Sequence, residues 1–310
     1  MNAPRLIAID MDGTLLGSNG QVSTRNLEAL RKAEAAGIEI VIATGRRHAY
    51  AMRVLRGLGL HATHAMVSSN GTVLRTLGSE LLHRRHMQAS TARWLCEYVK
   101  DFRSTLVMTF DKVGSDGNES RGAMVVESLD ALRESINRWV EANAASIEPV
   151  SPVENALEND LPIQMMLCGT MQRMGEAEAR LLEDPRIHDA RRGETPTGAE
   201  ITLHRTEYPS RNLCILDILP AGVSKASALQ CLMELRGLEA DDVLAIGDNW
   251  NDLPMLELAG HAVLMSNAPG PLKELAGDRG WTIGPSHDED GVAVAIEGVL
   301  AAAGIVPVSA

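Results

Sequence analysis

Two aspartates, Asp10 and Asp12, close the short apolar stretch that begins the chain, in the segment IAIDMDGTLLGS. A carboxylate at the end of a buried segment costs free energy unless a cation, a proton or water compensates its charge. A second pair of acids, Asp248 and Asp252, follows another apolar stretch in the segment GDNWND. Carboxylates in these positions can bind a metal ion, act as nucleophiles or acid–base groups, or simply form turns.

The segments around these acids have the pattern of a parallel α/β sheet, in which short apolar runs alternate with stretches of helical spacing. The N-terminal part predicts strand 5–10, a helix capped by Ser23 and stopped by Gly37, strand 38–45, helix 46–59 and, over 64–72, a third strand that ends at Asn70 and runs into a turn. The C-terminal part predicts helix 224–237, strand 241–248, helix 251–260 and strand 261–268. Together they predict the α/β class, with one Rossmann-like parallel sheet.

The middle of the chain has a different pattern. Two helix-like stretches, 90–102 and 128–143, alternate with strand-like stretches at 104–111, 122–127, 162–169 and 213–219. Two polar loops, 112–122 and 189–200, contain no recognisable motif. We therefore predict a core domain of residues 1–84 and 220–310 with an inserted α+β domain, residues 85–219.

All four aspartates fall at the carboxyl ends of predicted strands, where open α/β sheets bind their ligands. These ends meet at one rim of a parallel sheet, so we expect the four carboxylates to crowd together. Four carboxylates in one site need a cation or protons to offset their repulsion. Oxygen ligands with a phosphate partner favour Mg²⁺, whereas any one of these aspartates alone would more often cap a helix or form a turn.

Three further residues suit an anion at the same rim. Thr44 supplies a hydroxyl and Gly45 a bare backbone amide at the start of a predicted helix, where phosphate is favoured. Lys225 lies in the first turn of its helix, where the helix dipole disfavours a cation. This position indicates that the Lys225 ammonium group faces an anion, although a lone lysine is more often a solvated surface residue.

The composition of the chain argues against several classes of binding partner. The 310 residues include 29 Lys and Arg against 41 Asp and Glu, a net charge of -12, which repels nucleic acid and anionic membranes. No signal-peptide pattern is present, and no apolar run approaches the ~18 residues of a membrane span. The four cysteines are far apart and suggest neither zinc nor a disulfide framework. We expect a reduced, cytoplasmic protein with a small-molecule partner; oligomeric state is not predicted.

Four motifs stand in order along the chain: DMDGTL at 10–15, ATGR at 43–46, Lys225 in PAGVSKASAL, and GDNWNDLPML from 247. In this order they resemble the haloacid dehalogenase superfamily and, within it, the Cof-type phosphatases of subfamily IIB. Smaller similarities are SSNGT, SNAPGPLKELAG and HDEDGVA. The resemblance covers both flanks of the chain, and in the middle it is limited to LCILDILP.

The resemblance implies a role for each matching residue. Asp10 would be the nucleophile and Asp12 the general acid and base of a phosphate monoesterase. Mg²⁺ would be held by Asp10, the backbone carbonyl of Asp12 and Asp248, with Asp252 as a further ligand or as a support. The groups expected to hold the phosphoryl oxygens are the amide of Met11 and residues Thr44, Gly45, Lys225 and Asn251. The middle domain would be a cap that supplies substrate specificity.

Other functions of this chain would require different features of the sequence or different reaction products. A dehalogenase needs no general acid at Asp12, and an ion pump of this chemistry needs membrane helices. A phosphomutase stays open and would release no inorganic phosphate. A binding protein without activity also stays open, but it would be expected to lose Asp10, Asp12 or Lys225, all of which are present. Candidate substrates are sugar phosphates, phosphorylated cofactors and nucleotides, and the basic stretch HRRH at 83–86 is expected to be a solvated turn.

Overall fold

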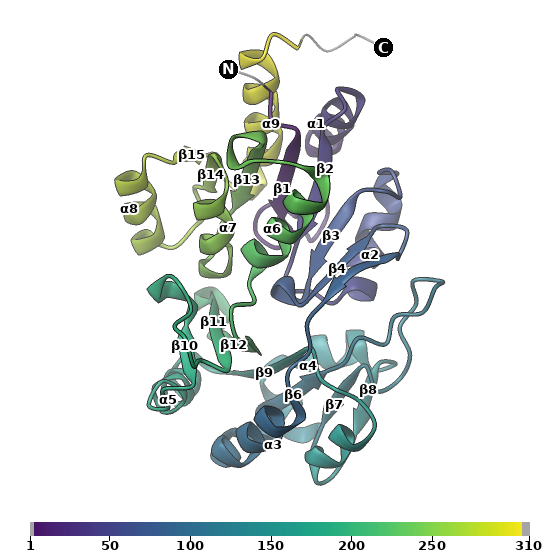
Figure 1. The fold of residues 1–310 in the computed structure, drawn as a ribbon, viewed down its shortest axis with the longest axis vertical. Coiled ribbons are helices and arrows are strands. Elements are labelled where there is room, and N and C mark those ends of the chain that lie inside the picture. The colour runs from purple at the N-terminus through teal and green to yellow at the C-terminus, as the bar shows by residue number, and fades with distance from the viewer. Residues whose placement is uncertain (1–2, 306–310) are drawn as a thin grey trace. The chain divides into compact units, whose positions relative to one another are not determined.

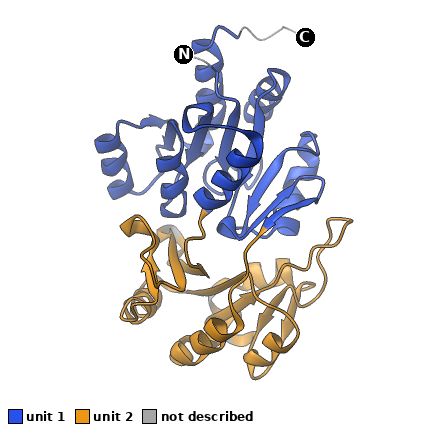
Figure 2. Cartoon of the chain, in the orientation of Figure 1, with its two compact units in different colours: residues 1–83, 225–310 blue, residues 84–224 orange. Residues whose placement is uncertain are grey.

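The computed structural model describes residues 3–305, and the chain divides into two compact units (Figure 2). Unit 1 combines the two ends of the chain, up to His83 and from Lys225 onward, and unit 2 is the intervening segment Arg84–Ser224. Among the described residues, no helix has the length and apolar character needed to span a membrane.

In the described residues, unit 1 is built on an eight-stranded sheet of order β15-β14-β13-β1-β2-β3-β4-β5 (Figure 1). The strands from β15 to β3 in this order are parallel neighbours, and β4 is antiparallel to β3. Their bounds are β1 (Leu6–Asp10), β2 (Glu39–Ala43), β3 (Ala65–Ser68), β4 (Val73–Thr76), β5 (Leu81–Arg84), β13 (Val243–Gly247), β14 (His261–Met265) and β15 (Thr282–Gly284). The predicted α/β class with a Rossmann-like parallel sheet is confirmed.

Helices cover both faces of this sheet, as the alternation of β1 shows. Ile7 and Ile9 belong to one buried cluster with α1, α2 and α9, whereas Leu6 and Ala8 belong to another with α6, α7 and α8. The bounds of these helices are α1 (Thr24–Ala35), α2 (His48–Leu55), α6 (Lys225–Arg236), α7 (Leu253–Leu258), α8 (Gly270–Arg279) and α9 (Gly291–Ala302). Because successive side chains point to opposite faces, a strand buried on both faces is apolar throughout. The first polar residue that follows the apolar run of such a strand therefore lies at the rim of the sheet.

The ends of the elements differ in detail from the sequence prediction. The Ser23 side chain caps α1 by accepting a hydrogen bond from the amide of Asn26 at 3.0 Å, as expected. The third strand was expected to end at Asn70 and ends at Ser68 instead, because Ser69 and Asn70 take left-handed backbone angles, with φ of 48° and 53°. A strand needs an extended backbone, so the chain leaves the sheet there.

Unit 2 contains, in its described residues, a seven-stranded sheet of order β10-β11-β12-β9-β6-β7-β8. Its strands are β6 (Leu106–Thr109), β7 (Met124–Val126), β8 (Ile147–Pro149), β9 (Gln164–Gly169), β10 (Ile187–Asp189), β11 (Ile201–Tyr208) and β12 (Leu213–Pro220). Leu167 and Leu216 pack with α3 (Ala89–Tyr98) and α5 (Met171–Leu181), whereas Val107 and Cys168 pack with α4 (Asp130–Asn143). Helix α5 and strands β8, β10 and β11 were absent from the sequence prediction.

Candidate active site

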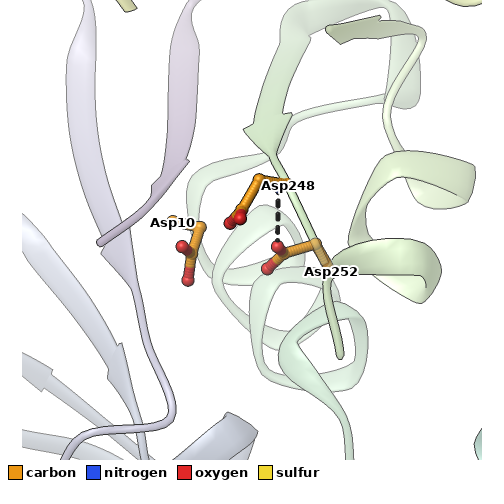
Figure 3. A group of neighbouring side chains, drawn as sticks. All are labelled: Asp10, Asp248 and Asp252. Carbon is orange, nitrogen blue, oxygen red and sulfur yellow. Dashed lines mark hydrogen bonds between the residues drawn. The ribbon is translucent and has the colours of Figure 1, made fainter. Parts of the chain in front are cut away.

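Three buried carboxylates meet at the carboxyl rim of the unit 1 sheet (Figure 3). Asp10 is the last residue of β1, Asp248 directly follows β13, and Asp252 ends the 3-10 turn η8 (Trp250–Asp252). One carboxylate oxygen from each lies within 4.8 Å of the others, and the residues are only 4%, 7% and 0% exposed. The Asp12 side chain is not one of the three whose oxygens lie within 4.8 Å of one another, but its charge also raises the pKa of Asp10.

Lys225 is the cation within the carboxylate group. Its Nζ donates hydrogen bonds to Asp10 Oδ1 at 2.5 Å and to Asp252 Oδ1 at 2.6 Å, and the residue is fully buried. Burial alone would lower the pKa of Lys225, but the charges of Asp10 and Asp252 and the hydrogen bonds to them raise it above its ordinary value. Lys225 therefore remains charged, and its place at the start of α6 is explained by the carboxylates it contacts.

The carboxylates nevertheless carry more negative charge than Lys225 offsets. Burial and the charge of Asp252 raise the pKa of Asp10 to about 7, even though Lys225 acts in the opposite direction. The pKa of Asp248 is also raised well above its ordinary value, by burial and by the charges of Asp10 and Asp252. A divalent cation would remove this repulsion, and an all-oxygen donor set suits Mg²⁺. The oxygen donors of the three carboxylates and their excess negative charge therefore fit a Mg²⁺ ion.

Asp252 is bonded on both of its oxygens. Its Oδ2 accepts hydrogen bonds from the amides of Asp248 and Asn249, each at 3.0 Å, and its Oδ1 accepts the bond from Lys225. Figure 3 shows the first of these bonds joining Asp252 to the backbone of Asp248. Asp252 thus fixes the loop that carries Asp248.

The Asp248 carboxylate is oriented by two neutral donors. Thr14 Oγ1 donates to Asp248 Oδ1 and Asn267 Nδ2 donates to Asp248 Oδ2, both at 3.1 Å. Gly13 has a φ of +86°, and a Cβ at this position would lie 2.5 Å from Asp248 Oδ2. Residue 13 is therefore restricted to glycine by its backbone and by the closeness of the carboxylate.

Asp12 has a different partner from the buried acids. Arg46 donates to both of its oxygens, from Nε at 2.7 Å and from Nη2 at 2.5 Å, and the Asp12 side chain is 38% exposed. Met11, between the two aspartates, is fully buried in the core beneath the rim. Asp12 is thus the accessible acid of the pair, and Asp10 the enclosed one.

The remaining predicted residues lie at neighbouring strand ends. Thr44 directly follows β2 and is fully buried, and its Oγ1 accepts a hydrogen bond from the amide of Arg46 at 3.0 Å. Asn251 lies in η8 and donates from Nδ2 to Asn70 Oδ1 at 3.1 Å. Three partners in this region were given no role from the sequence: Arg46, Thr14 and Asn267. Each stands inside a quoted motif, but its contact joins residues far apart in the chain.

Comparison with known proteins agrees with this geometry. A family model described as haloacid dehalogenase-like hydrolase matches residues 7–296. The chain is 29% identical over 307 residues to the 5-amino-6-(5-phospho-D-ribitylamino)uracil phosphatase YwtE of Bacillus subtilis (strain 168), covering 96% of this chain and 98% of the relative. It is 27% identical over 274 residues to the HMP-PP phosphatase of Escherichia fergusonii, covering 87% and 86%.

A solved structure extends the similarity to three dimensions. A haloacid dehalogenase-like hydrolase from Bacteroides thetaiotaomicron matches with a TM-score of 0.71 and 26% identity, covering 96% of this chain and 99% of that chain. The resemblance inferred from the four motifs is confirmed. The chain belongs to the haloacid dehalogenase-like hydrolase family and is a hydrolase.

Proposed function

We propose that this protein is a Mg²⁺-dependent phosphatase that hydrolyses a small phosphorylated metabolite through an aspartyl-phosphate intermediate. The observation that carries the proposal is the buried group of Asp10, Asp248 and Asp252 around the Lys225 ammonium. It places one potential nucleophile, Asp10, among charges that can bind both a cation and a phosphoryl group. The family membership of the chain supports the same chemistry.

Asp10 is the proposed nucleophile. One of its carboxylate oxygens attacks phosphorus, and the bond from phosphorus to the leaving oxygen of the ester breaks. Water then attacks the same phosphorus, the bond to Asp10 breaks, and inorganic phosphate leaves. Lys225 holds the Asp10 carboxylate in place through the 2.5 Å hydrogen bond. This bond fixes one oxygen of Asp10 before the ester arrives, which lowers the cost of orienting the nucleophile.

Asp12 is the proposed acid and base. It gives a proton to the leaving oxygen in the first step and takes one from water in the second. Its accessibility supports this role, because a group that exchanges protons with both a substrate and water must be reachable by both. The two hydrogen bonds from Arg46 hold the Asp12 carboxylate in one orientation.

Mg²⁺ would be held by Asp10, Asp248 and the backbone carbonyl of Asp12, with Asp252 as the support behind them. The supporting role for Asp252 follows from its oxygens, which already accept three hydrogen bonds. When bound, the ion offsets the charge of the carboxylates and of the phosphoryl oxygens. The proposed phosphoryl-binding groups are the amides of Met11 and Gly45 and the side chains of Thr44, Lys225 and Asn251.

The proposed substrate class is a small phosphorylated metabolite in the cytoplasm. Two relatives that are similar over most of their length are named for such substrates, one with a phosphoribitylamino-uracil and one with HMP-PP. In this proposal unit 2 acts as the cap that selects among substrates.

The test is release of inorganic phosphate from a generic aryl phosphate. Wild-type protein with Mg²⁺ is expected to turn over, and Asp10→Asn is expected to lose at least about 10³-fold in kcat because no covalent intermediate can form. Asp278→Asn, which changes an exposed acid on α8, is the matched control and keeps its activity. Full turnover by Asp10→Asn, or activity that survives exhaustive chelation, would contradict the proposal. A phosphomutase would consume a sugar phosphate without releasing phosphate.

A further inference from the structure

The turn between β3 and β4 has an unusual backbone. Ser69, Asn70 and Gly71 are consecutive and buried, and all three take left-handed angles, with φ of 48°, 53° and 104°. Residues other than glycine rarely adopt this conformation, and it persists only where surrounding contacts hold it in place. Residues held in this way concentrate at functional sites, so the contacts of this turn call for an explanation.

Asn70 connects three strand ends. Its backbone amide donates to the carbonyl of Thr44 at 3.1 Å, which joins the end of β3 to the segment after β2. Its side-chain Oδ1 accepts a hydrogen bond from Asn251 Nδ2 at 3.1 Å, which joins it to η8. Both Thr44 and Asn251 are among the groups proposed to hold the phosphoryl oxygens.

The Asn70 side chain also lies against Gly45. A Cβ at Gly45 would be 3.2 Å from both Asn70 Nδ2 and Asn70 Oδ1. That approach is tighter than most Cβ contacts, so an alanine at residue 45 would push the Asn70 amide out of position. Because Gly45 has no Cβ, it leaves room for the Asn70 side chain.

We propose that Asn70 is a positioning residue that orients the Asn251 amide toward the phosphoryl group. This inference rests on the proposed phosphatase function. An asparagine amide has a donor end and an acceptor end of similar shape, and hydrogen bonds decide which way it points. Because Asn70 Oδ1 accepts one N–H of Asn251, the nitrogen end of the Asn251 amide is held at Asn70, and its second N–H can donate to an anion. Without Asn70 the amide can turn and present its oxygen, which repels phosphate.

The main test is Asn70→Gly, because glycine adopts the same left-handed backbone without strain and removes only the side chain. We expect its inhibition constant for inorganic phosphate, and its KM for an aryl phosphate, to rise about tenfold, the value of one hydrogen bond to an anion. The matched control is Asn212→Gly, since Asn212 also has left-handed angles, with φ of 46°, but lies in the turn between β11 and β12. This control is expected to keep wild-type constants.

A double-mutant cycle tests whether Asn70 acts through Asn251. Asn251→Ala alone should weaken phosphate binding, and Asn70→Gly added to it should cause little further loss. Fully additive losses, or wild-type constants in Asn70→Gly, would overturn the inference. Gly45→Ala is a second variant: it should weaken phosphate binding in the wild-type background and cause a smaller loss in the Asn70→Gly background, where the crowded amide is gone.

The outcomes separate this inference from the proposed function. If the wild type releases no phosphate from any ester, the phosphatase proposal fails. Binding of inorganic phosphate by calorimetry, with Mg²⁺ present, then still tests Asn70. Weaker binding in Asn70→Gly supports the positioning role, and unchanged binding overturns it. If Asn70→Gly does not fold, Gly45→Ala carries the test, and unchanged phosphate binding in that variant overturns the inference.

Discussion

Arg46 binds Asp12 through two parallel hydrogen bonds, Nε to Oδ2 at 2.7 Å and Nη2 to Oδ1 at 2.5 Å. The guanidinium also lies 5.1 Å from the centre of the Tyr50 ring, on helix α2. A planar guanidinium matches a carboxylate at two points, so the pair restricts rotation of the Asp12 carboxylate as well as its position. The proposed acid–base group is therefore oriented by a residue that reaches it from the next strand end.

Arg46→Met is expected to lower kcat by about 10- to 100-fold with a smaller change in KM, because Asp12 would lose its orientation rather than its chemistry. Arg46→Lys should recover only part of the rate, since an ammonium group contacts a carboxylate as a single point charge. Arg279→Met is the control, because Arg279 forms an exposed pair with Glu257 on the surface of unit 1. Equal kcat in Arg46→Met and wild type would show that Asp12 needs no such partner.

Gly13→Ala is expected to abolish turnover and to weaken Mg²⁺ binding by at least about 100-fold, since its Cβ would collide with the Asp248 carboxylate and displace it. Gly20→Ala is a close control. Gly20 has a similar φ of +74°, but no atom of the described residues lies within 4 Å of the place that a Cβ would take, so alanine there adds only the backbone strain. Steady-state kinetics and Mg²⁺ titration distinguish the two variants. Similar losses in both would assign the effect to strain rather than to the collision.

The residues at the carboxyl rim of the unit 1 sheet could be predicted, because each strand end follows a local pattern of apolar and polar residues. Each buried strand has an apolar run, and the first polar residue after that run marks the strand end, as for Asp10 and Thr44. Parallel strands then bring these ends together whatever their separation in the chain. For this reason Asp10 and Asp248 could be placed in one site, although 237 residues lie between them.

The direction of the Asp12 side chain could not be predicted, because the period-two alternation of a strand stops where the strand ends. Strand β1 stops at Asp10, and the chain turns so that the amide of Leu15 bonds the Asp10 carbonyl at 3.2 Å. The contacts of Arg46 and Asn267 could not be predicted either, since they depend on side-chain directions that the spacing of residues does not contain. In unit 2, Gly175 interrupts the helical signal of α5, and four consecutive polar residues, 204–207, hide the strand pattern of β11.

Lys225→Met is expected to remove activity and to destabilise the metal-free protein by roughly 3 kcal/mol, because two buried carboxylates, Asp10 and Asp252, would lose the ammonium group that both of them contact. Saturating Mg²⁺ should restore part of this stability, since the ion offsets the same charge. Chemical denaturation with and without Mg²⁺ measures both effects. Lys32→Met, on the surface of α1, is the control and should leave stability and activity nearly unchanged. A Lys225→Met protein that is as stable as wild type in chelator would contradict the charge balance described for this site.

The raised pKa of Asp10 predicts a pH-dependent loss of stability in the metal-free protein. Burial and the Asp252 charge raise this pKa from 3.8 to about 7 in the folded state, so between these values the folded protein holds a proton that the unfolded chain has released. The contribution of Asp10 to stability is therefore fully present below about pH 4 and falls as the pH rises to about 7. Asp10→Asn cannot ionise and lacks this dependence.

In chelator, the stability of Asp10→Asn relative to wild type should thus increase between about pH 4 and pH 7 and level off above it, with a total change of at most roughly 4 kcal/mol. Mg²⁺ should reduce the difference, because the bound ion stabilises the ionised carboxylate that only the wild type possesses. Denaturant unfolding of both proteins across this pH range, with chelator and with Mg²⁺, measures the change. Parallel stability curves in chelator would mean that Asp10 is already ionised at low pH in the folded protein, and that Lys225 alone compensates its charge.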